Sequence, residues 1–331
     1  MSTRCSLSVC AICGGSGINQ RYLTSPDYIS GITFQLSRCT SCGSLQTIAP
    51  PASDKHDYYG TEYYNSEKGK FSLIIEHIFH LNHARNARAL QRRFPAKRVL
   101  EVGCGRGYLL SELKKMGVSV RCLESASAAE WILDNPDVPV STLSDTEESA
   151  WPFEDQAFDL VIFWHVLEHL PDPATSLKET YRCLAPGGSV YISIPDISSL
   201  QARMHPATWF HLDVPRHLYH FSEKGLKSAL TRTGFTAVRN MAGDRMQNLF
   251  GWLQSTANLF TPRHINAIYR LIQGGAPLRN IDPVSLFIQL LTSWIWIPAG
   301  LAGFVIEELS GSYGTITVHA LKPNTAYKQP D

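Results

Sequence analysis

The stretch that decides the fold runs from Val99 to Gly107 and reads VLEVGCGRG. In it an apolar strand enters a turn dense in glycine, and a second apolar run ends soon afterwards at Glu124. Gly103, Gly105 and Gly107 let the backbone bend sharply and approach a ligand that side chains would keep away. An acid at the end of the second strand can accept hydrogen bonds from the two hydroxyls of a ribose. The pattern predicts a nucleotide cradle.

The spacing of the glycines distinguishes between two classes of nucleotide cofactor. Dinucleotide-binding domains carry the pattern G-x-G-x-x-G after their first strand. This chain has an acid, Glu101, followed by G-x-G-x-G from Gly103 to Gly107. That difference favours S-adenosylmethionine over NAD.

Two further segments follow in the chain. Residues 158–170 read FDLVIFWHVLEHL, and residues 184–188 read LAPGG and lead into the apolar run 190–194. In this order, the three segments resemble class I methyltransferases, over residues 95–243 and a final strand near the C-terminus. The resemblance implies a doubly wound, Rossmann-like α/β sheet of seven strands, with S-adenosylmethionine as cofactor. It implies an enzyme, not a Rossmann-like domain that has lost its ligand.

The chain divides into five expected parts. These are a zinc-ribbon-like module at 1–53, an aromatic segment and helical linker at 54–94, the methyltransferase core at 95–245, an apolar helical insertion at 246–311, and the final strand of the core with a tail at 312–331. Strands one to five are expected at 98–103, 118–124, 138–142, 159–163 and 189–194. Strands six and seven, at 237–243 and 315–321, are expected to be antiparallel neighbours on either side of the insertion.

The composition is that of an ordinary globular chain. Its 331 residues are 44% hydrophobic and 18% charged, with a formal net charge of +1. This balance disfavours a nucleic-acid partner that depends on a broad basic surface. No basic segment followed by an apolar core opens the chain, so we expect a cytoplasmic protein. In such a reducing compartment the eight cysteines are expected to bind metal or pack in the core, not to form disulfides.

Four cysteines form the pattern Cys10-x2-Cys13-x25-Cys39-x2-Cys42. Each C-x-x-C pair can sit on a tight turn, and two such turns point four thiolates at one Zn²⁺. The spacer is longer than in the usual zinc ribbon, yet zinc is favoured over a redox pair because nothing thioredoxin-like surrounds either motif. A closed four-thiolate site leaves no open coordination position, so its expected role is folding. The other cysteines are expected to be solitary packing residues: Cys5, Cys104, Cys122 and Cys183.

The segment between the module and the core has two features. Residues 58–64 read YYGTEYY and resemble an aromatic segment that precedes the core when a zinc ribbon is fused to it; closure over the cofactor and simple packing both remain open. Apolar residues at helical spacing predict a helix over 71–94. Its histidines, His77, His80 and His83, lie three apart, and no acid or cysteine joins them in that spacing, so a solvated face is expected rather than a metal site.

The resemblance also implies which residues contact the cofactor. The glycine loop and the acids of the first two strands surround it, Leu143 lies near the adenine, and the loop from His165 to His169 faces the methyl donor. The implied cofactor-binding residues are Glu101, Gly103, Cys104, Gly105, Gly107, Glu124, Leu143 and His165.

His165 has three interpretations. It is a general base, a polar contact to the methionine carboxylate of the cofactor, or a buried hydrogen-bonded histidine. The pair Glu168-His169 resembles the loop of the ubiquinone-biosynthesis O-methyltransferases, where acids can hold a divalent cation. Those enzymes have an acid at the position of His165, which argues against a catalytic metal here.

A second group of candidate bases follows strand five. Residues 209–221 read WFHLDVPRHLYHF and combine aromatic residues with three histidines, an acid and an arginine. Because this loop leaves the ligand-binding end of the sheet, we favour an acceptor site over a merely structural loop. His217 or His211 would be the base and Arg216 an anion clamp. The candidate catalytic residues are therefore His165, His169, His211 and His217.

The insertion between strands six and seven holds two apolar stretches. The second, Pro283 to Ile306, has no charged residue and is long enough to be a candidate membrane span. A single span is disfavoured because strand seven has to return to the sheet and because Pro298 and Gly300 interrupt the run. Three interpretations remain: a buried helical cap, which is favoured, peripheral membrane contact through 246–306, and a lid on a pocket for an apolar acceptor. Because the insertion leaves strand six at the cofactor end of the sheet, we also expect it to form one wall of the acceptor pocket.

The last resemblance concerns the acceptor. Residues 214–221, VPRHLYHF, resemble a segment of bacterial methyltransferases linked to surface-polysaccharide and secondary-metabolite pathways. It implies methylation of oxygen or carbon in a small molecule: a sugar, a glycolipid precursor or a secondary metabolite. One alternative is an RNA methyltransferase, which the few cations of residues 1–53 (Arg4, Arg21 and Arg38) disfavour. The other is a non-catalytic nucleotide-binding scaffold.

Overall fold

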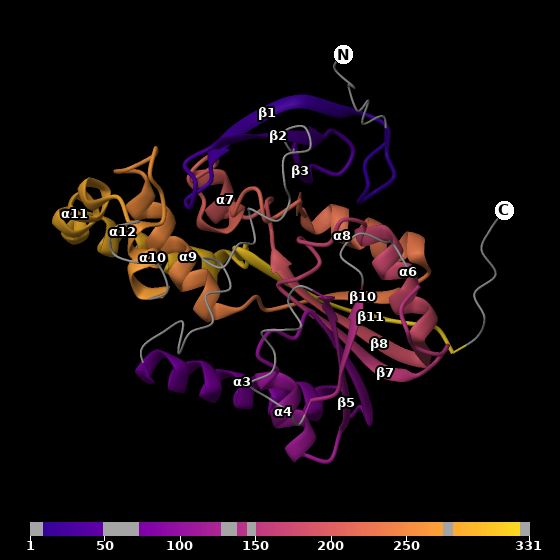
Figure 1. The fold of residues 1–331 in the computed structure, drawn as a ribbon. Coiled ribbons are helices and arrows are strands. Elements are labelled where there is room, and N and C mark those ends of the chain that lie inside the picture. Colours follow the sequence, from indigo (N-terminus) through magenta and orange to yellow (C-terminus); the bar gives the residue numbers. More distant parts are fainter. Residues whose placement is uncertain (1–8, 49–72, 127–137, 144–149, 274–280, 325–331) are drawn as a thin grey trace.

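The computed structural model describes residues 9–48, 73–126, 138–143, 150–273 and 281–324. Two sheets organise these ranges, a central sheet of seven strands and a smaller one of four (Figure 1). The aromatic segment 58–64 and Cys5 lie outside the described residues, so their predicted roles stay predictions.

The central sheet confirms the predicted doubly wound α/β fold. It consists of β4 (Arg98–Val102), β5 (Ser119–Ser125), β6 (Val140–Leu143), β7 (Phe158–Trp164), β8 (Leu184–Pro195), β10 (Thr236–Met241) and β11 (Thr315–Leu321). Their order in space is β10-β11-β8-β7-β4-β5-β6. β4 to β8 run parallel, and β11 is antiparallel to both β8 and β10, as predicted for the last two strands.

Helices cover both faces of this sheet (Figure 1). On β7, Val161 and Phe163 pack into a core shared with α6 (Pro173–Cys183) and α8 (Glu223–Thr233). Ile162, between them, packs into the core shared with α3 (Leu73–Arg93) and α4 (Tyr108–Lys115). Successive side chains of a strand point to opposite faces, so a continuous apolar run serves both cores, as is usual in parallel sheets.

The smaller sheet joins the N-terminal part of the chain to its second half. β1 (Ile18–Pro26), β2 (Thr33–Cys39) and β3 (Leu45–Ile48) form an antiparallel ribbon, and β9 (Tyr219–His220) completes it by pairing with β3. Side chains reinforce the junction: Ser222 Oγ donates to Cys42 O at 2.6 Å and Thr47 Oγ1 donates to His217 O at 2.7 Å. The cysteine module therefore shares its sheet with the segment that follows strand five.

The insertion after β10 is helical, as predicted. It consists of α9 (Arg245–Asn258), α10 (Ala267–Gln273), α11 (Pro283–Leu291) and α12 (Ser293–Ser310), and α11 and α12 project from the body (Figure 1). Among the described helices, none alone is long and apolar enough to cross a membrane, although α11 and α12 together meet that test with a bend of 71° between them. The prediction of a buried cap is wrong for these two helices, because side chains such as Phe287 and Trp294 are 64% and 74% exposed.

Candidate functional site

The glycine loop connects β4 to α4 through backbone conformations that suit glycine. Gly103, Gly105 and Gly107 have φ angles of +68°, +52° and +68°. A Cβ at Gly103 would lie 2.4 Å from Val166, whereas a Cβ at Gly105 would meet no atom within 4 Å. The first glycine thus allows close packing against the loop after β7, and the second leaves open space beside the backbone.

Two acids lie beside this loop on neighbouring strands. Glu101 on β4 is buried, and its Oε2 has no hydrogen-bond partner among the described residues. Burial, followed by the charge of Glu124 on β5, raises the pKa of Glu101 to about 8. A buried carboxylate oxygen without a donor suits a ligand that brings one, and the α-amino group of S-adenosylmethionine is such a donor.

The other predicted cofactor residues follow the same edge of the sheet. Leu143 ends β6, where it pairs with Ser125 at the end of β5. His165 comes directly after β7. The carboxyl ends of parallel strands form the ligand-binding edge of a doubly wound sheet, so these residues meet at the expected edge.

The prediction that Cys104 and Cys122 are solitary packing residues is wrong. The two form a disulfide, which ties the glycine loop to β5 close to Glu124. β4 and β5 pair in parallel, and the turn after Val102 brings Cys104 back over Cys122. This return of the chain depends on strand register and cannot be read from the cysteine spacing. Cys183 is free and buried, as predicted.

The loop after β7 places His165 beside Glu168. The backbone of His165 has a φ of +54°, and its N–H donates to Ser193 O at 2.8 Å. The ring Nδ1 lies 3.6 Å from Glu168 Oε1, and Nε2 is buried without a hydrogen-bond partner in the described part of the chain. The side chain is 20% exposed, which distinguishes it from the more deeply buried histidines nearby.

Glu168 is the centre of the histidine cluster. Its side chain is buried, and neither carboxylate oxygen has a hydrogen-bond partner within the described ranges. His217 Nε2 lies 3.9 Å from Oε1, and His169 borders the same carboxylate. The backbone carbonyl of Glu168 accepts hydrogen bonds from the N–H groups of Leu218 and Tyr219. The loop after β7 and the segment 209–221 are therefore held together around one carboxylate.

Hydrogen bonds to the backbone fix the tautomers of two histidines. His169 Nδ1 donates to Arg216 O at 3.1 Å, and His217 Nδ1 donates to His211 O at 2.8 Å, because a carbonyl can only accept. Burial, with the charge of His169, lowers the pKa of His217 well below its usual range. Burial, with the charge of His165, lowers the pKa of His211 to about 3. Bases this weak take up a proton poorly near neutral pH.

The prediction of Arg216 as an anion clamp is wrong. Its guanidinium is fully buried, with Nη2 donating to Asp27 Oδ1 at 2.9 Å and Nε donating to Asp213 Oδ1 at 2.7 Å. The group also lies over the ring of Tyr28, 4.5 Å from its centre. Two carboxylates compensate its charge, so Arg216 ties the segment 209–221 to the loop after β1. Sequence analysis missed Asp27 because 189 positions separate it from its partner.

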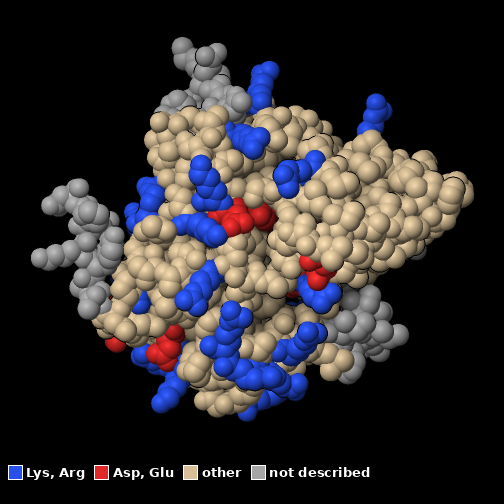
Figure 2. Space-filling view, turned by 180° about the vertical axis from the view of Figure 1, so that it is seen from behind, with Lys and Arg blue, Asp and Glu red and all other residues tan. Residues whose placement is uncertain are grey.

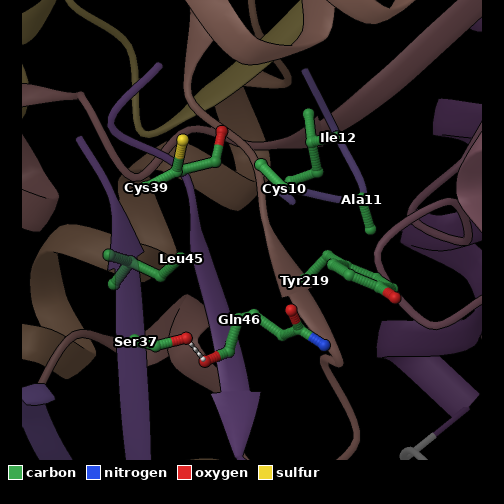
Figure 3. A pocket seen from close by; sticks show the side chains of 9 residues that line it. Cys10, Ala11, Ile12, Ser37, Cys39, Leu45, Gln46 and Tyr219 are labelled. Carbon is green, nitrogen blue, oxygen red and sulfur yellow. Dashed lines mark hydrogen bonds between the residues drawn. The ribbon is translucent and has the colours of Figure 1, made fainter. Parts of the chain in front are cut away.

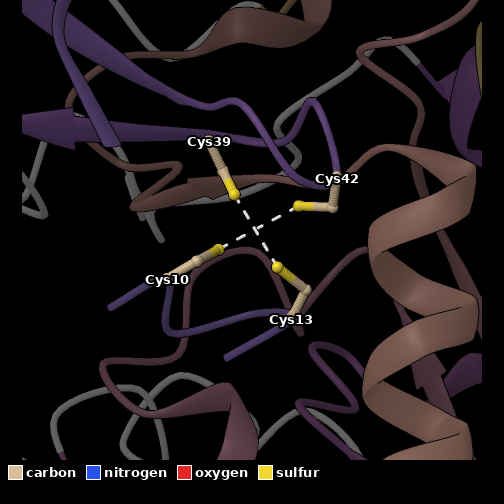
Figure 4. A group of neighbouring side chains, drawn as sticks. All are labelled: Cys10, Cys13, Cys39 and Cys42. Atoms are coloured by element: carbon tan, nitrogen blue, oxygen red, sulfur yellow. Dashed lines mark hydrogen bonds between the residues drawn. The ribbon is translucent and has the colours of Figure 1, made fainter. Parts of the chain in front are cut away.

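The four module cysteines gather as predicted (Figure 4). The Sγ atoms of Cys10 and Cys42 lie 4.0 Å apart, and those of Cys13 and Cys39 lie 3.7 Å apart. Thiolates at about 2.3 Å from a tetrahedral zinc are about 3.8 Å from one another. The spacing of the four sulfurs suits a divalent metal.

The predicted solvated histidine face of α3 is wrong for His83. Its ring lies 5.8 Å from that of Tyr108 and 6.4 Å from that of Trp164, and burial lowers its pKa. Tyr108 begins α4 and Trp164 ends β7, so α3 covers the site from the side of the glycine loop. Sequence analysis missed Trp164, although its place directly before His165 was a usable signal.

A small hollow lies between the module and β9 (Figure 3). Its lining includes Cys10, Cys39 and Tyr219, and Ser37 Oγ donates across it to Gln46 O at 3.4 Å. It contains none of the predicted catalytic histidines, so it belongs to the packing of the module.

Two kinds of comparison link this chain to known sequences. A family model described as a methyltransferase domain matches residues 74–240, which is just over half of the 331 residues. Ubiquinone biosynthesis O-methyltransferases from Proteus mirabilis and Ralstonia nicotianae are each 33% identical to it over 101 residues. These matches cover 29% of this chain and 41% and 42% of the two relatives, so the chain spans less than half of their length.

Solved structures resemble the chain at lower identity. Phosphoethanolamine N-methyltransferase 2 from Haemonchus contortus, in complex with S-adenosyl-L-methionine, has a TM-score of 0.47 at 15% identity, covering 84% of this chain and 62% of that one. A structure described as a sarcosine dimethylglycine methyltransferase from Galdieria sulphuraria has a TM-score of 0.48 at 16% identity, covering 74% and 87%.

The family match and the seven-stranded sheet agree with the predicted glycine loop and its two acids. An orphaned buried oxygen on Glu101 and open space at Gly105 fit the cofactor that this family uses. The chain belongs to the methyltransferase-domain family.

Proposed function

We propose that this protein is an S-adenosylmethionine-dependent methyltransferase that methylates an oxygen atom of a small-molecule acceptor, with His165 as the general base. The observation that carries the proposal is the contact between the two loops. The position of a Cβ on Gly103 is 2.4 Å from Val166, the residue after His165, so the His165 loop packs directly on the glycine loop. A base there is close to where the methyl donor would bind.

Several residues would hold the cofactor. Glu101 Oε2 would accept a hydrogen bond from its amino group, Glu124 would receive the ribose hydroxyls, and the open space at Gly105 would admit the ligand beside the backbone. The bound cofactor supplies a methyl group on a positively charged sulfur, which is the electrophile of the reaction.

His165 and Glu168 would act as a pair. His165 Nε2 would take the proton of an acceptor hydroxyl, which makes the oxygen a better nucleophile. Glu168, 3.6 Å from Nδ1, would balance the charge that the ring acquires. His169 and His217 border the same carboxylate and would hold it in place rather than exchange protons, since burial keeps His217 neutral.

The small-molecule, oxygen-centred acceptor is supported by the relatives. The proteins from Proteus mirabilis and Ralstonia nicotianae are named as O-methyltransferases of ubiquinone biosynthesis. Because the chain spans less than half of their length, the acceptor itself is inferred as a class only: a hydroxyl on a small organic molecule.

A methyl-transfer assay tests this function. Labelled S-adenosylmethionine is added to small-molecule extracts of the source organism, and mass analysis identifies methylated products. We expect His165→Gln to lower kcat by about 10²- to 10⁴-fold with unchanged binding of S-adenosylhomocysteine. His264→Gln, at an exposed position outside the cluster, is the matched control. Full turnover by the His165 variant would refute its role as base, and labelling of RNA alone would refute the acceptor class.

We further propose that the four module cysteines hold a structural zinc ion. The spacing of the sulfurs and the gathering of all four thiols at one point support it. Elemental analysis of the purified protein is expected to give about one zinc per chain and none in the Cys13→Ser variant. A wild-type protein without zinc, but with normal folding, would refute the site.

A further inference from the structure

The helix pair α11–α12 has its polar side chains inside and its apolar side chains outside. On α11, Ser285 and Gln289 are buried. The exposed positions of the same helix are apolar: Val284, Phe287, Leu290 and Leu291, with exposed fractions of 53% to 64%. A helix on a water-facing surface has the opposite arrangement.

Gln289 and Glu307 each find a hydrogen-bond partner within the insertion, although Oε1 of Glu307 has none among the described residues. Gln289 Nε2 donates to Thr261 Oγ1 at 2.7 Å, and Gln289 O accepts from Trp296 Nε1 at 2.6 Å. Glu307 near the end of α12 accepts from Trp252 Nε1 of α9, also at 2.6 Å. Internal satisfaction of polar groups is what a medium without water demands.

The buried seam of α12 is narrow and built from small residues. Gly300 and Gly303 face α9, where an added Cβ would lie 3.1 Å from Leu253 and 2.3 Å from Trp252. Such close contacts through glycine are typical of helices that pack within lipid. The exposed apolar residues of α12 spread over about half of its circumference at 100° per residue: Trp294, Ile295, Ile297, Leu301, Val305, Ile306 and Leu309.

Charge is absent from the same surface. No charged residue occurs between Pro283 and Ile306, and the projecting arm in Figure 2 is mostly tan, whereas blue side chains are scattered over the remaining face. Asp282 stands just before α11, and Glu307 and Glu308 stand near the end of α12. The uncharged surface is thus bounded at both ends of the pair.

The path of the chain limits how this surface can be used. β10 leads into α9, and α12 leads into β11, and these two strands are neighbours in the central sheet. The insertion therefore leaves and re-enters the body at the same place. With a 71° bend between α11 and α12, the pair can enter a membrane and return without crossing it.

We infer that α11 and α12 insert into one leaflet of a lipid bilayer and hold the enzyme on the membrane surface. A protein partner would cover one stripe of a helix, whereas here the apolar surface extends over about half of α12 and continues onto α11. The fluid hydrocarbon of a bilayer adapts to any shape and can therefore cover such a surface completely. The inward glycines and the internally paired polar groups fit the same medium.

Flotation of the full-length protein with vesicles tests the inference. Vesicles of phosphatidylethanolamine and phosphatidylglycerol are expected to carry the wild-type protein upward in a density gradient, also in 0.5 M salt, at about the ionic strength that screens surface charge within a few ångströms. The double variant Phe287→Glu/Trp294→Glu is expected to lower the bound fraction at least about tenfold. Ile32→Glu, at a 51% exposed apolar residue directly before β2, is the matched control and should float like the wild type.

Two measurements keep the outcomes distinct. Calorimetry with S-adenosylhomocysteine is expected to give the same affinity for the double variant and the wild type, which verifies that the variant is folded and does not depend on the proposed acceptor. Light scattering in the absence of lipid measures the oligomeric state and so tests whether a second copy of the chain, rather than lipid, covers the apolar surface. A stable dimer that does not float, or flotation that the double variant retains, would overturn the inference.

Discussion

At the scale of single residues, we expect Glu101 to couple proton binding to cofactor binding. The pKa of its carboxyl is raised from 4.5 to about 8, so the group is largely protonated at pH 7 in the free enzyme. An ammonium group beside it stabilises the charged form and expels the proton. We expect S-adenosylhomocysteine to release close to one proton per chain at pH 7, measured by calorimetry in buffers of different ionisation enthalpy. Glu101→Gln should abolish the release, and proton uptake by the wild type would contradict the assignment.

The same shift has a consequence for stability without cofactor. A carboxyl whose pKa is raised by folding contributes stability that is complete below pH 4.5 and is lost as the pH rises through about 8. The free energy of unfolding should therefore fall across that window on account of Glu101, and cofactor should oppose the fall.

Two glycines of the same loop should respond differently to alanine. Gly103→Ala places a Cβ against Val166 and is expected to lower the free energy of unfolding by about 2–3 kcal/mol. In Gly105→Ala the added Cβ meets open space, so the free energy of unfolding should fall by only about 1 kcal/mol. The same variant should weaken S-adenosylhomocysteine binding at least about tenfold, because the ligand needs that space. Urea unfolding and calorimetry measure the two effects. Normal binding by the Gly105 variant would contradict the placement of the cofactor.

At the scale of elements, the disulfide holds the glycine loop to β5. It closes a loop with a sequence separation of 18 residues, for which the loss of chain entropy predicts a stabilisation of about 3 kcal/mol. In the variant Cys104→Ala/Cys122→Ala the free energy of unfolding should be lower by about that amount. Dithiothreitol should lower the free energy of unfolding of the wild type but not that of the variant. Alkylation of both thiols in the unreduced, denatured wild type would show that the bond does not form.

Elements governed by local sequence were predictable, and those governed by register were not. β11 has the predicted bounds, 315–321, because its apolar run is flanked by clear breaks. The pairing of β9 with β3 joins segments more than 170 positions apart, and the return of Cys104 over Cys122 depends on a strand alignment. The apolar run at 283–306 was visible in the sequence, but which of its faces is exposed was not.

In the candidate site, too, residues placed by local sequence were predictable and contacts between distant segments were not. The histidines at 165, 169 and 217 could be named because they follow strands at the ligand-binding edge, and the structure brings them to one carboxylate. Arg216 was misjudged because two carboxylates compensate its buried charge, and one of them, Asp27, lies 189 positions away in the sequence. Local pattern thus located the site but not its ion pairs.

At the scale of the whole molecule, we expect removal of the proposed zinc ion to affect the methyltransferase core as well as the cysteine module. The module contacts the core through β9 and through the hydrogen bond from Ser222 to Cys42. We expect a strong chelator to lower Tm by roughly 10 °C and to abolish methyl transfer, as measured by differential scanning fluorimetry and the labelling assay. Cys13→Ser should behave like the chelated protein, whereas Cys183→Ser should keep its metal and its activity. Full activity after complete zinc loss would contradict this coupling.

The fourth strand of the small sheet also bears on how such a protein arises. Tyr219 and His220 form β9, which follows strand five of the core in the sequence and completes the four-stranded sheet of the N-terminal ribbon by pairing with β3. Recombination that exchanged only about the first fifty positions would bring in a ribbon whose β3 edge no longer matched β9. We therefore expect the N-terminal ribbon and β9 to be inherited together. Chimaeras between relatives should fold only when both segments come from the same parent.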